Sequence, residues 1–211
     1  MAAIIHSDPW TVDRRLSQYF NSTRDQWIEI VKAAVAARAR CTDDSPKSAP
    51  GYYAWEAATT RSRQMFRREG WEKGEENGIE TIVNHALKKK VAILNTDSGT
   101  CDKNRSPRNR THKGSAQDRV IDLNDQYEMF KSGEMRKIVE TPYSIWYLCV
   151  FDDGTKVRTE VSRPSEFHLG YIIKFNERIF ILNDGDWEKM VLAAPPPSQS
   201  AQDFEINIRR K

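Results

Sequence analysis

Apolar residues recur at helical spacing in the first third of the chain. Five of them in residues 22–40 follow the pattern i, i+3, i+4, i+7 and i+8, which places them on one face of a helix. They are Trp27, Ile30, Val31, Ala34 and Val35. Ser22 and Asp25 stand at the start of this segment and predict an acidic variant of the capping box. The pattern therefore predicts an amphipathic helix that begins near Ser22.

Two further helices are predicted around this one. Asp8 and Pro9 precede the segment WTVDRRLSQYF, and an aspartate cap followed by proline in the first turn is typical of a helix start. Residues 53–68 also carry small and apolar residues at helical spacing, and Gly70 follows them as a candidate C-cap. Residues 1–78 are therefore predicted to form a helical region.

Short β-branched runs replace the helical spacing after Gly78. The runs IETIVN and KKVAILN, residues 79–84 and 89–95, predict two neighbouring strands. Asp153-Gly154 lies between YSIWYLCVF and TKVRTEVS, which predicts a hairpin. Asn176-Glu177 lies between GYIIKF and RIFIL and predicts a second hairpin. Consecutive hairpins of this kind are typical of a curled antiparallel sheet.

These elements predict an α+β fold, in which N-terminal helices pack on a mainly antiparallel, curled β-sheet or small open barrel with a long basic loop. Three regions are expected along the chain: a helical region 1–78, a β-rich region 79–193 with the basic loop 96–118, and a Pro/Ser linker and C-terminal tail 194–211. With 211 residues, of which 38% are hydrophobic, the chain is long enough to bury a sizeable core.

Positive charge is concentrated in one loop. The chain has 33 Lys and Arg against 30 Asp and Glu, so its formal net charge of +3 is too small to indicate a polyanionic partner by itself. A loop as long as residues 96–118 is usually functional or disordered in a compact domain. The candidate nucleic-acid-binding residues are cations and a histidine of this loop, with two arginines of the third helix: Arg63, Arg67, Lys103, Arg105, Arg108, Arg110, His112, Lys113 and Arg119.

The chemistry of these side chains favours phosphate. Guanidinium groups present planar pairs of donors that match phosphate oxygens, so the sequence predicts a basic binding protein that engages nucleic acid or a nucleoprotein complex. Aromatic residues are absent from the loop, so stacking on bases is not indicated there. Helix-turn-helix, zinc-finger, RNA-recognition and cold-shock signatures are also absent, so a nucleic-acid role would depend on shape and charge.

A second candidate site lies where the predicted strand 89–95 ends. The segment NTDSGT provides short polar side chains and a glycine that can bring the backbone close to a ligand. The candidate polar ligand residues are Asn95, Asp97, Ser98 and Thr100. An Asx-turn that simply starts the loop is the alternative explanation.

Carboxylates raise the alternative of a metal-dependent nuclease or a nucleotide-acting enzyme. Asp152, Asp153 and Glu160 form one acidic set, but Ser162 occupies the position where such a site would supply a lysine. Glu160, on a strand face, is expected to face solvent. A second acidic set around the loop consists of Glu80, Asp97 and Asp102. Catalytic residues are not assigned, and neither a metal site nor a cofactor is expected.

A third hypothesis is an inhibitor or adaptor of a protein partner, such as an accessory factor of a mobile element or defence system. Cys41, Cys101 and Cys149 are odd in number and widely spaced, which argues against a disulfide framework or a cysteine zinc site. Cys101 would be reactive if the loop cations lowered its pKa, and inert otherwise. The mean hydropathy of −0.72 and the absence of an export signal predict a cytoplasmic protein with no membrane partner.

Overall fold

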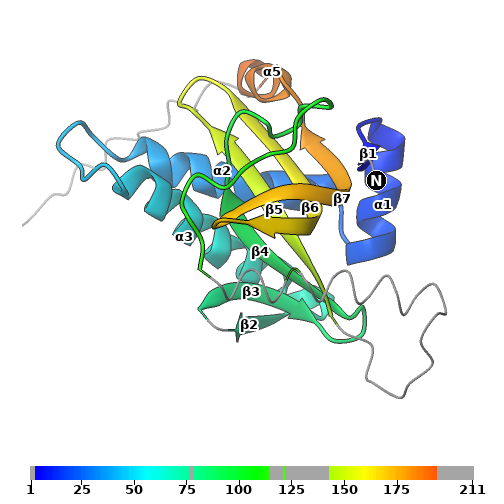
Figure 1. Ribbon diagram of the computed structural model, residues 1–211. Coiled ribbons are helices and arrows are strands. Elements are labelled where there is room, and N and C mark those ends of the chain that lie inside the picture. Colours follow the sequence, from blue (N-terminus) through cyan, green and yellow to red (C-terminus); the bar gives the residue numbers. More distant parts are fainter. Residues whose placement is uncertain (1–2, 77, 115–120, 122–142, 194–211) are drawn as a thin grey trace, which may run out of the picture.

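A single mixed sheet forms the centre of the protein. The computed structural model describes residues 3–76, 78–114, 121 and 143–193. Within them the strands lie in the order β1-β7-β6-β5-β4-β3-β2, and the sheet is open (Figure 1). The strands are β1 (Ile4–His6), β2 (Glu72–Glu76), β3 (Ile79–Asn84), β4 (Lys89–Asn95), β5 (Ser144–Asp152), β6 (Val157–His168) and β7 (Tyr171–Leu182). Four of the six described strand pairs are antiparallel, whereas β1–β7 and β4–β5 are parallel.

The described helices confirm the predicted N-terminal helical segments. They are α1 (Pro9–Phe20), α2 (Arg24–Ala39), α3 (Ala49–Phe66), the short 3-10 helix η1 (Arg67–Glu69) and α5 (Asp186–Ala193). The α+β class is therefore confirmed. Asp8 caps α1 through its side chain, and Gly70 follows η1 in the left-handed conformation, as the sequence predicts. The helix α5 and the edge strands β1 and β2 were not predicted.

The start of α2 differs from the predicted capping box. Thr23 is the N-cap, and its backbone N–H donates to the side-chain oxygen of Gln26 at 2.8 Å. Ser22 is instead buried, and its hydroxyl accepts a hydrogen bond from Trp27 Nε1 at 2.9 Å. Ser22 therefore satisfies a polar atom of the core, and the cap moves one residue along the chain.

The predicted hairpin at Asp153-Gly154 is confirmed, because β5 and β6 pair antiparallel across it. The second predicted turn is wrong, since Asn176-Glu177 lies inside the continuous strand β7. The turn lies at Leu169-Gly170, where both residues have positive φ, 45° and 80°. A Cβ atom at Gly170 would lie 2.1 Å from His112 Nε2, so both the backbone conformation and the close approach require glycine.

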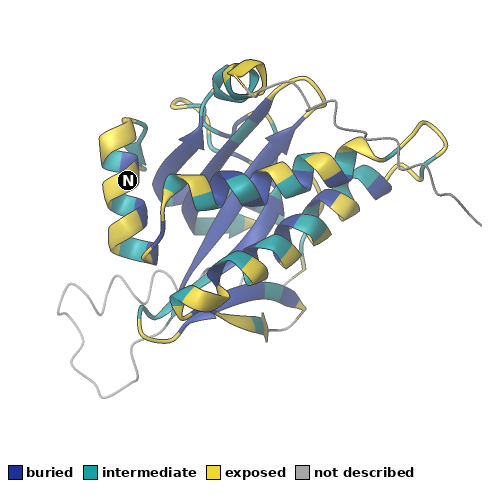
Figure 2. Ribbon diagram, turned by 180° about the vertical axis from the view of Figure 1, so that it is seen from behind, coloured by how far each residue is buried: buried dark blue, intermediate teal, exposed yellow. Residues whose placement is uncertain are grey.

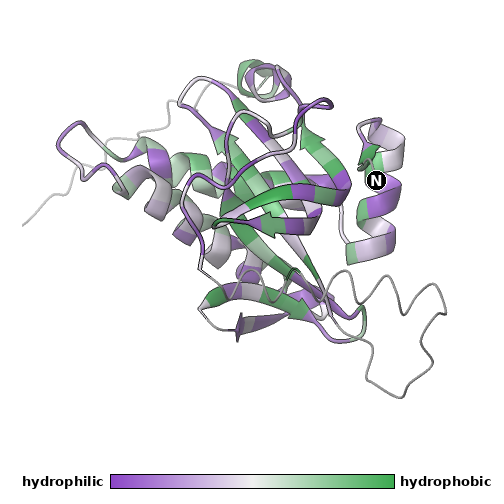
Figure 3. Ribbon diagram, viewed as in Figure 1, coloured by the Kyte–Doolittle hydropathy of each residue, from purple (hydrophilic) through white to green (hydrophobic). Residues whose placement is uncertain are grey.

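Helices and loop cover opposite faces of the sheet. The helices α2 and α3 pack on one face (Figure 2), over a core that includes Trp27, Phe66, Trp146 and Ile179. On the other face, residues 96–114 cross in front of the strands as a largely hydrophilic segment (Figure 3). A second apolar cluster around Tyr147 and Phe175 lies on this side.

The strands link the predicted regions, because β1 and β2 come from residues 1–78 and pair with β7 and β3 of the β-rich region. The division into three regions stays a prediction. Residues 115–118 of the predicted loop, Arg119, most of the segment that follows, and the tail 194–211 lie outside the described residues. Among the helices that are described, none combines the length and the apolar character needed to cross a membrane.

Candidate anion-binding site

A buried arginine from β7 holds the basic loop in place. Arg178 is 1% exposed, and its Nη1 donates to the carbonyl oxygens of Asp102 and Arg105 at 2.8 and 3.1 Å. Its Nη2 donates to the Gly99 carbonyl at 3.1 Å. Glu160 neutralises it through two bonds of 2.8 and 2.6 Å. Glu160 is itself 0% exposed, which corrects the expectation that it faces solvent.

The far end of the described loop is also fixed. The backbone N–H of Arg110 donates to the carbonyl of Asn95 at 3.0 Å. Asn109 is buried, accepts from the N–H of Ile172 at 2.9 Å and donates to the carbonyl of Gly170 at 2.9 Å. The loop is therefore attached to β4 at one side and to the β6–β7 hairpin at the other.

The two aspartates in the described part of the loop, Asp97 and Asp102, bind its own backbone. Asp97 Oδ1 accepts from the N–H groups of Gly99 and Arg108 at 2.9 and 3.1 Å, so the predicted Asx-turn is present. Asp102 Oδ1 accepts from the N–H of Asn104 at 2.8 Å. These carboxylates therefore stabilise the loop's shape.

The described cations of the loop have no such partners among the described carboxylates. Within residues 96–114, five cations lie farther than 4.0 Å from every carboxylate oxygen of the described residues: Lys103, Arg105, Arg108, Arg110 and Lys113. Arg108 and Arg110 lie over the rings of Tyr171 and Phe151, at 4.8 and 5.6 Å from the centroids. The loop therefore presents positive charge from a fixed backbone.

Other predicted site residues have different surroundings. Arg63 on α3 pairs with Glu80 of β3 and donates to the Gly74 carbonyl at 3.2 Å, whereas Arg67 is exposed in η1. His112 packs edge-on against Tyr171, with ring centroids 5.9 Å apart. The Arg63 charge is thus already paired.

Most of the candidate polar ligand residues form hydrogen bonds within the loop itself. The Thr100 hydroxyl contacts the Thr96 hydroxyl at 2.7 Å and is buried. Ser98 accepts a hydrogen bond from Arg105. Asn95 differs, because it borders a cavity and its Nδ2 donates to the Gly51 carbonyl at 2.7 Å.

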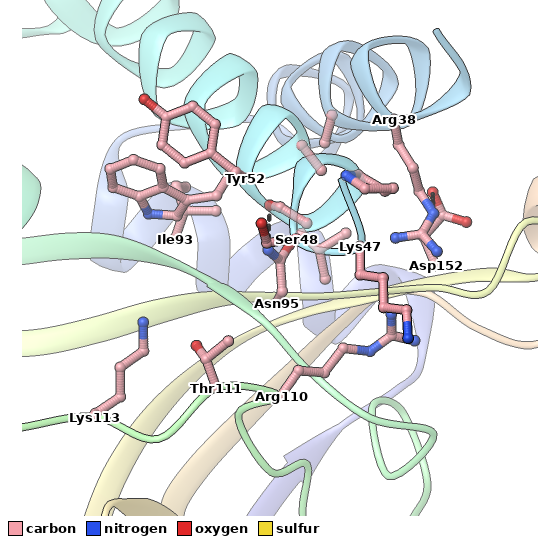
Figure 4. Close-up of a pocket in the computed structure, with 16 residues that line it drawn as sticks. Arg38, Lys47, Ser48, Tyr52, Ile93, Asn95, Arg110, Thr111, Lys113 and Asp152 are labelled. Atoms are coloured by element: carbon pink, nitrogen blue, oxygen red, sulfur yellow. Dashed lines mark hydrogen bonds and ion pairs between the residues drawn. The ribbon is translucent and has the colours of Figure 1, made fainter. Parts of the chain in front are cut away.

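This cavity, of about 550 Å³, opens where the parallel strands β4 and β5 end against the first turn of α3 (Figure 4). Ligands of open α/β sheets commonly bind beyond the carboxyl ends of parallel strands. The charged residues of its lining are Arg38, Lys47, Arg110, Lys113 and Asp152. Arg110 and Lys113 belong to the basic loop, so loop and cavity form one continuous site.

The cavity has an excess of positive charge. Asp152 is the single carboxylate among its lining residues, and Arg38 Nε lies 3.5 Å from Asp152 Oδ2. Lys47, Arg110 and Lys113 remain without a carboxylate partner among the described residues. Burial lowers the pKa of Lys113 below its ordinary value, because a partly desolvated ammonium is disfavoured. An anion in the cavity would restore the stabilisation that this ammonium loses.

Aromatic side chains complete the wall. Tyr52 is 57% exposed although it borders the cavity, and its ring centroid lies 6.0 Å from that of Trp55 at a 43° tilt. Sequence reasoning missed these residues because it searched for aromatics within the loop. The signal was the segment GYYAW at the start of the third helix, which the fold brings to the loop.

The carboxylates of the enzyme hypothesis have structural partners. Arg38 pairs with Asp152, and Arg178 with Glu160. The backbone N–H groups of Lys156 and Thr155 lower the pKa of Asp153 to about 2. Within the part of the chain that the structure describes, no three His, Cys, Asp or Glu side chains are grouped to hold a metal ion.

Comparisons with known proteins add no relative. A scan against protein-family models found no match, and searches of curated proteins and of solved structures found none either. Function is therefore inferred from the geometry and charge of the site.

Proposed function

We propose that the protein binds nucleic acid through the basic loop and the adjoining cavity. The observation that carries the proposal is the arrangement of charge: five loop cations, which have no carboxylate partner among the described residues, project from a backbone that Arg178 and Glu160 hold from beneath. Asp97 and Asp102 are turned to backbone amides and do not neutralise these cations. Phosphate oxygens are suitable partners for such cations.

A loop whose backbone is already fixed should bind a ligand more tightly than a freely moving loop would. Ordering a segment on a ligand costs conformational entropy, and a loop already held in its conformation avoids much of that cost. Asn104 and Thr111 are exposed between the cations and add neutral donors for sugar and phosphate oxygens. Along the loop, the exposed cations and neutral donors therefore resemble a contact surface for a nucleic-acid backbone.

The test is a salt series with matched charge variants. Arg105→Gln/Arg108→Gln removes two loop cations, and Lys32→Gln/Lys156→Gln removes two that already pair with Glu29 and Asp184. Fluorescence anisotropy of labelled DNA and RNA gives affinity against salt concentration. The loop variant should make the slope of log affinity against log salt shallower by about 0.9 per lost contact on duplex DNA, or about 0.7 on single strands.

The control variant should keep the wild-type slope, because its net charge falls equally while the loop is intact. If both variants made the slope of log affinity against log salt equally shallow, total charge alone would account for binding. Absence of salt-dependent binding to DNA and RNA at low ionic strength would refute the proposal. An inhibitor or adaptor of a protein partner would then be the next hypothesis.

A further inference from the structure

We propose that the cavity between α3 and the ends of β4 and β5 receives one unpaired nucleotide of the bound strand, with its phosphate at Lys47 and Arg110 and its base against Tyr52. This inference rests on the proposed nucleic-acid binding and adds a preference for unpaired over duplex substrate. It assigns a role to three residues from separate segments: the connection before α3, the basic loop and α3 itself.

The size of the cavity fits a single nucleotide. Its volume of about 550 Å³ lies within the range of roughly 300–1,000 Å³ typical of small-ligand pockets. A base pair with two backbones is too large for it, whereas a base with its sugar and phosphate is of the right order. A duplex could therefore contact the loop cations outside but not enter.

The polar and aromatic groups are separated along the cavity. Lys47 and Arg110 project toward the same end in the view of Figure 4, and Tyr52 lies toward the other, the side on which Lys113 also lies. A nucleotide has the same division, since its charge is on the phosphate and its flat apolar surface is on the base. The side chains of Ile93 and Val150 supply an apolar floor between the two ends.

Tyr52 is suited to stacking because it is not packed away. It is 57% exposed, and its two ring contacts, tilted against Trp55 and edge-on against Tyr53, do not occupy it as a parallel stack would. Bases stack on such rings with little regard to sequence. A helix that ends at Phe66, well before the loop begins at Thr96, thus supplies the stacking ring that the loop lacks.

The experiment compares neighbouring tyrosines. Tyr52 and Tyr53 are adjacent on α3 and are 57% and 50% exposed, but only Tyr52 borders the cavity. Tyr52→Ala should weaken binding of a short single-stranded oligothymidylate about tenfold, while binding of a duplex of equal length stays unchanged. Tyr53→Ala removes an edge-on neighbour of Tyr52 but leaves the Tyr52 ring in the cavity, so it should change neither affinity. Tyr52→Phe should keep single-strand binding because it keeps the ring.

A second pair of variants tests the phosphate end. Lys47→Gln should reduce single-strand affinity and make its salt slope shallower by about 0.7, whereas Lys32→Gln, outside the cavity, should not. Thymidine monophosphate should compete with the oligothymidylate for the wild type but not for Tyr52→Ala. Thermal melting checks that each variant is folded.

The outcomes separate this inference from the proposed function. If Arg105→Gln/Arg108→Gln weakens both nucleic acids but Tyr52→Ala weakens neither, the loop binds nucleic acid and the cavity assignment is wrong. Equal losses for single strand and duplex with Tyr52→Ala would also overturn it. If the wild type binds neither nucleic acid, both the proposed function and this inference are wrong.

Discussion

Cys101 shows how its neighbours determine the chemistry of a single residue. Its position beside the loop cations made a lowered thiol pKa conceivable from sequence. In the structure, Sγ donates to the carbonyls of Thr159 and Leu182 at 3.1 and 3.2 Å. Burial raises the pKa of Cys101 well above its ordinary value, and the nearby charge of Glu160 adds to the effect. Cys101 is therefore a half-buried, hydrogen-bonded thiol with little thiolate near neutral pH.

The three thiols should react at different rates. Burial also raises the pKa of Cys149, which is 0% exposed. Cys41 and Cys101 are both partly exposed, but Cys101 Sγ donates to two carbonyls. With a colourimetric thiol reagent at mildly alkaline pH, we expect one fast thiol in the native protein and two more after denaturation. Cys41→Ser should abolish the fast phase. A fast second thiol in the native protein would contradict the assignment of Cys101.

Single residues also show how much of the site was predictable. The cations of residues 103–113 could be identified because a run of like residues needs no knowledge of the fold. Arg178 and Glu160 could not, since a strand arginine and glutamate resemble ordinary surface residues until both are found buried together. Tyr52 and Lys47 were missed for a related reason: their proximity to Arg110 is produced only by packing α3 against the strand ends.

At the scale of elements, the basic loop depends on its buried anchor. Glu160→Gln would leave the Arg178 guanidinium buried without its counter-charge, and breaking a buried pair in this way costs about 3–5 kcal/mol. We expect lower stability in urea and faster tryptic cleavage at Lys103, Arg105 and Arg108. In the wild type, the fixed backbone should protect these sites although their side chains are exposed.

Lys156→Gln provides the control for this prediction. It breaks an ion pair with Asp184 in which both side chains are more than half exposed, and such pairs contribute about 0–1 kcal/mol. The control should therefore keep wild-type stability and cleavage. If Glu160→Gln also left loop cleavage unchanged, hydrogen bonds such as those of Asn109 would be sufficient to hold the loop.

Elements were predictable where one physical signal dominated. Helical spacing identified α1, α2 and α3, and Asp-Gly identified the β5–β6 hairpin. In β7, Asn176 and Glu177 interrupt an apolar run, which suggested a turn. In the structure, His6 Nε2 of β1 lies 2.9 Å from Glu177 Oε1, so this carboxylate has a polar partner within the sheet. The strands β1 and β2 are edge strands with little buried surface, so hydrophobic alternation could not reveal them.

At the scale of the whole molecule, an aromatic cluster joins the helices to the sheet. Trp27 of α2 packs against Phe20 of α1 and Phe66 of α3, with centroids 5.5 and 4.9 Å apart. Phe20 in turn packs against Trp146 of β5 at 5.2 Å. Four elements thus share one set of ring contacts, and the core is continuous between helices and sheet.

Removing the central ring should destabilise the entire fold. Trp27→Ala is expected to lower the free energy of unfolding by about 3–5 kcal/mol, and it also leaves the buried Ser22 hydroxyl without its donor. Trp10→Ala is the control, because Trp10 is 67% exposed, and should change stability by less than about 0.5 kcal/mol. Urea unfolding measures both. Similar midpoints for the two variants would show that Trp27 is not central to the core.

The parallel pairings have a consequence for how the chain acquires its fold. Ile4 of β1 pairs with Glu177 of β7, and β4 pairs with β5 across the whole connection between them. Contacts so distant in sequence form slowly, because the chain loses the entropy of loop closure before these contacts can stabilise the fold. During synthesis, β5 and β6 emerge with their apolar faces before β7 is present to pair with β6. Arg178 emerges with β7, so the basic loop acquires its anchor only at that late stage, and a chain halted earlier would present an unpaired sheet edge prone to aggregation.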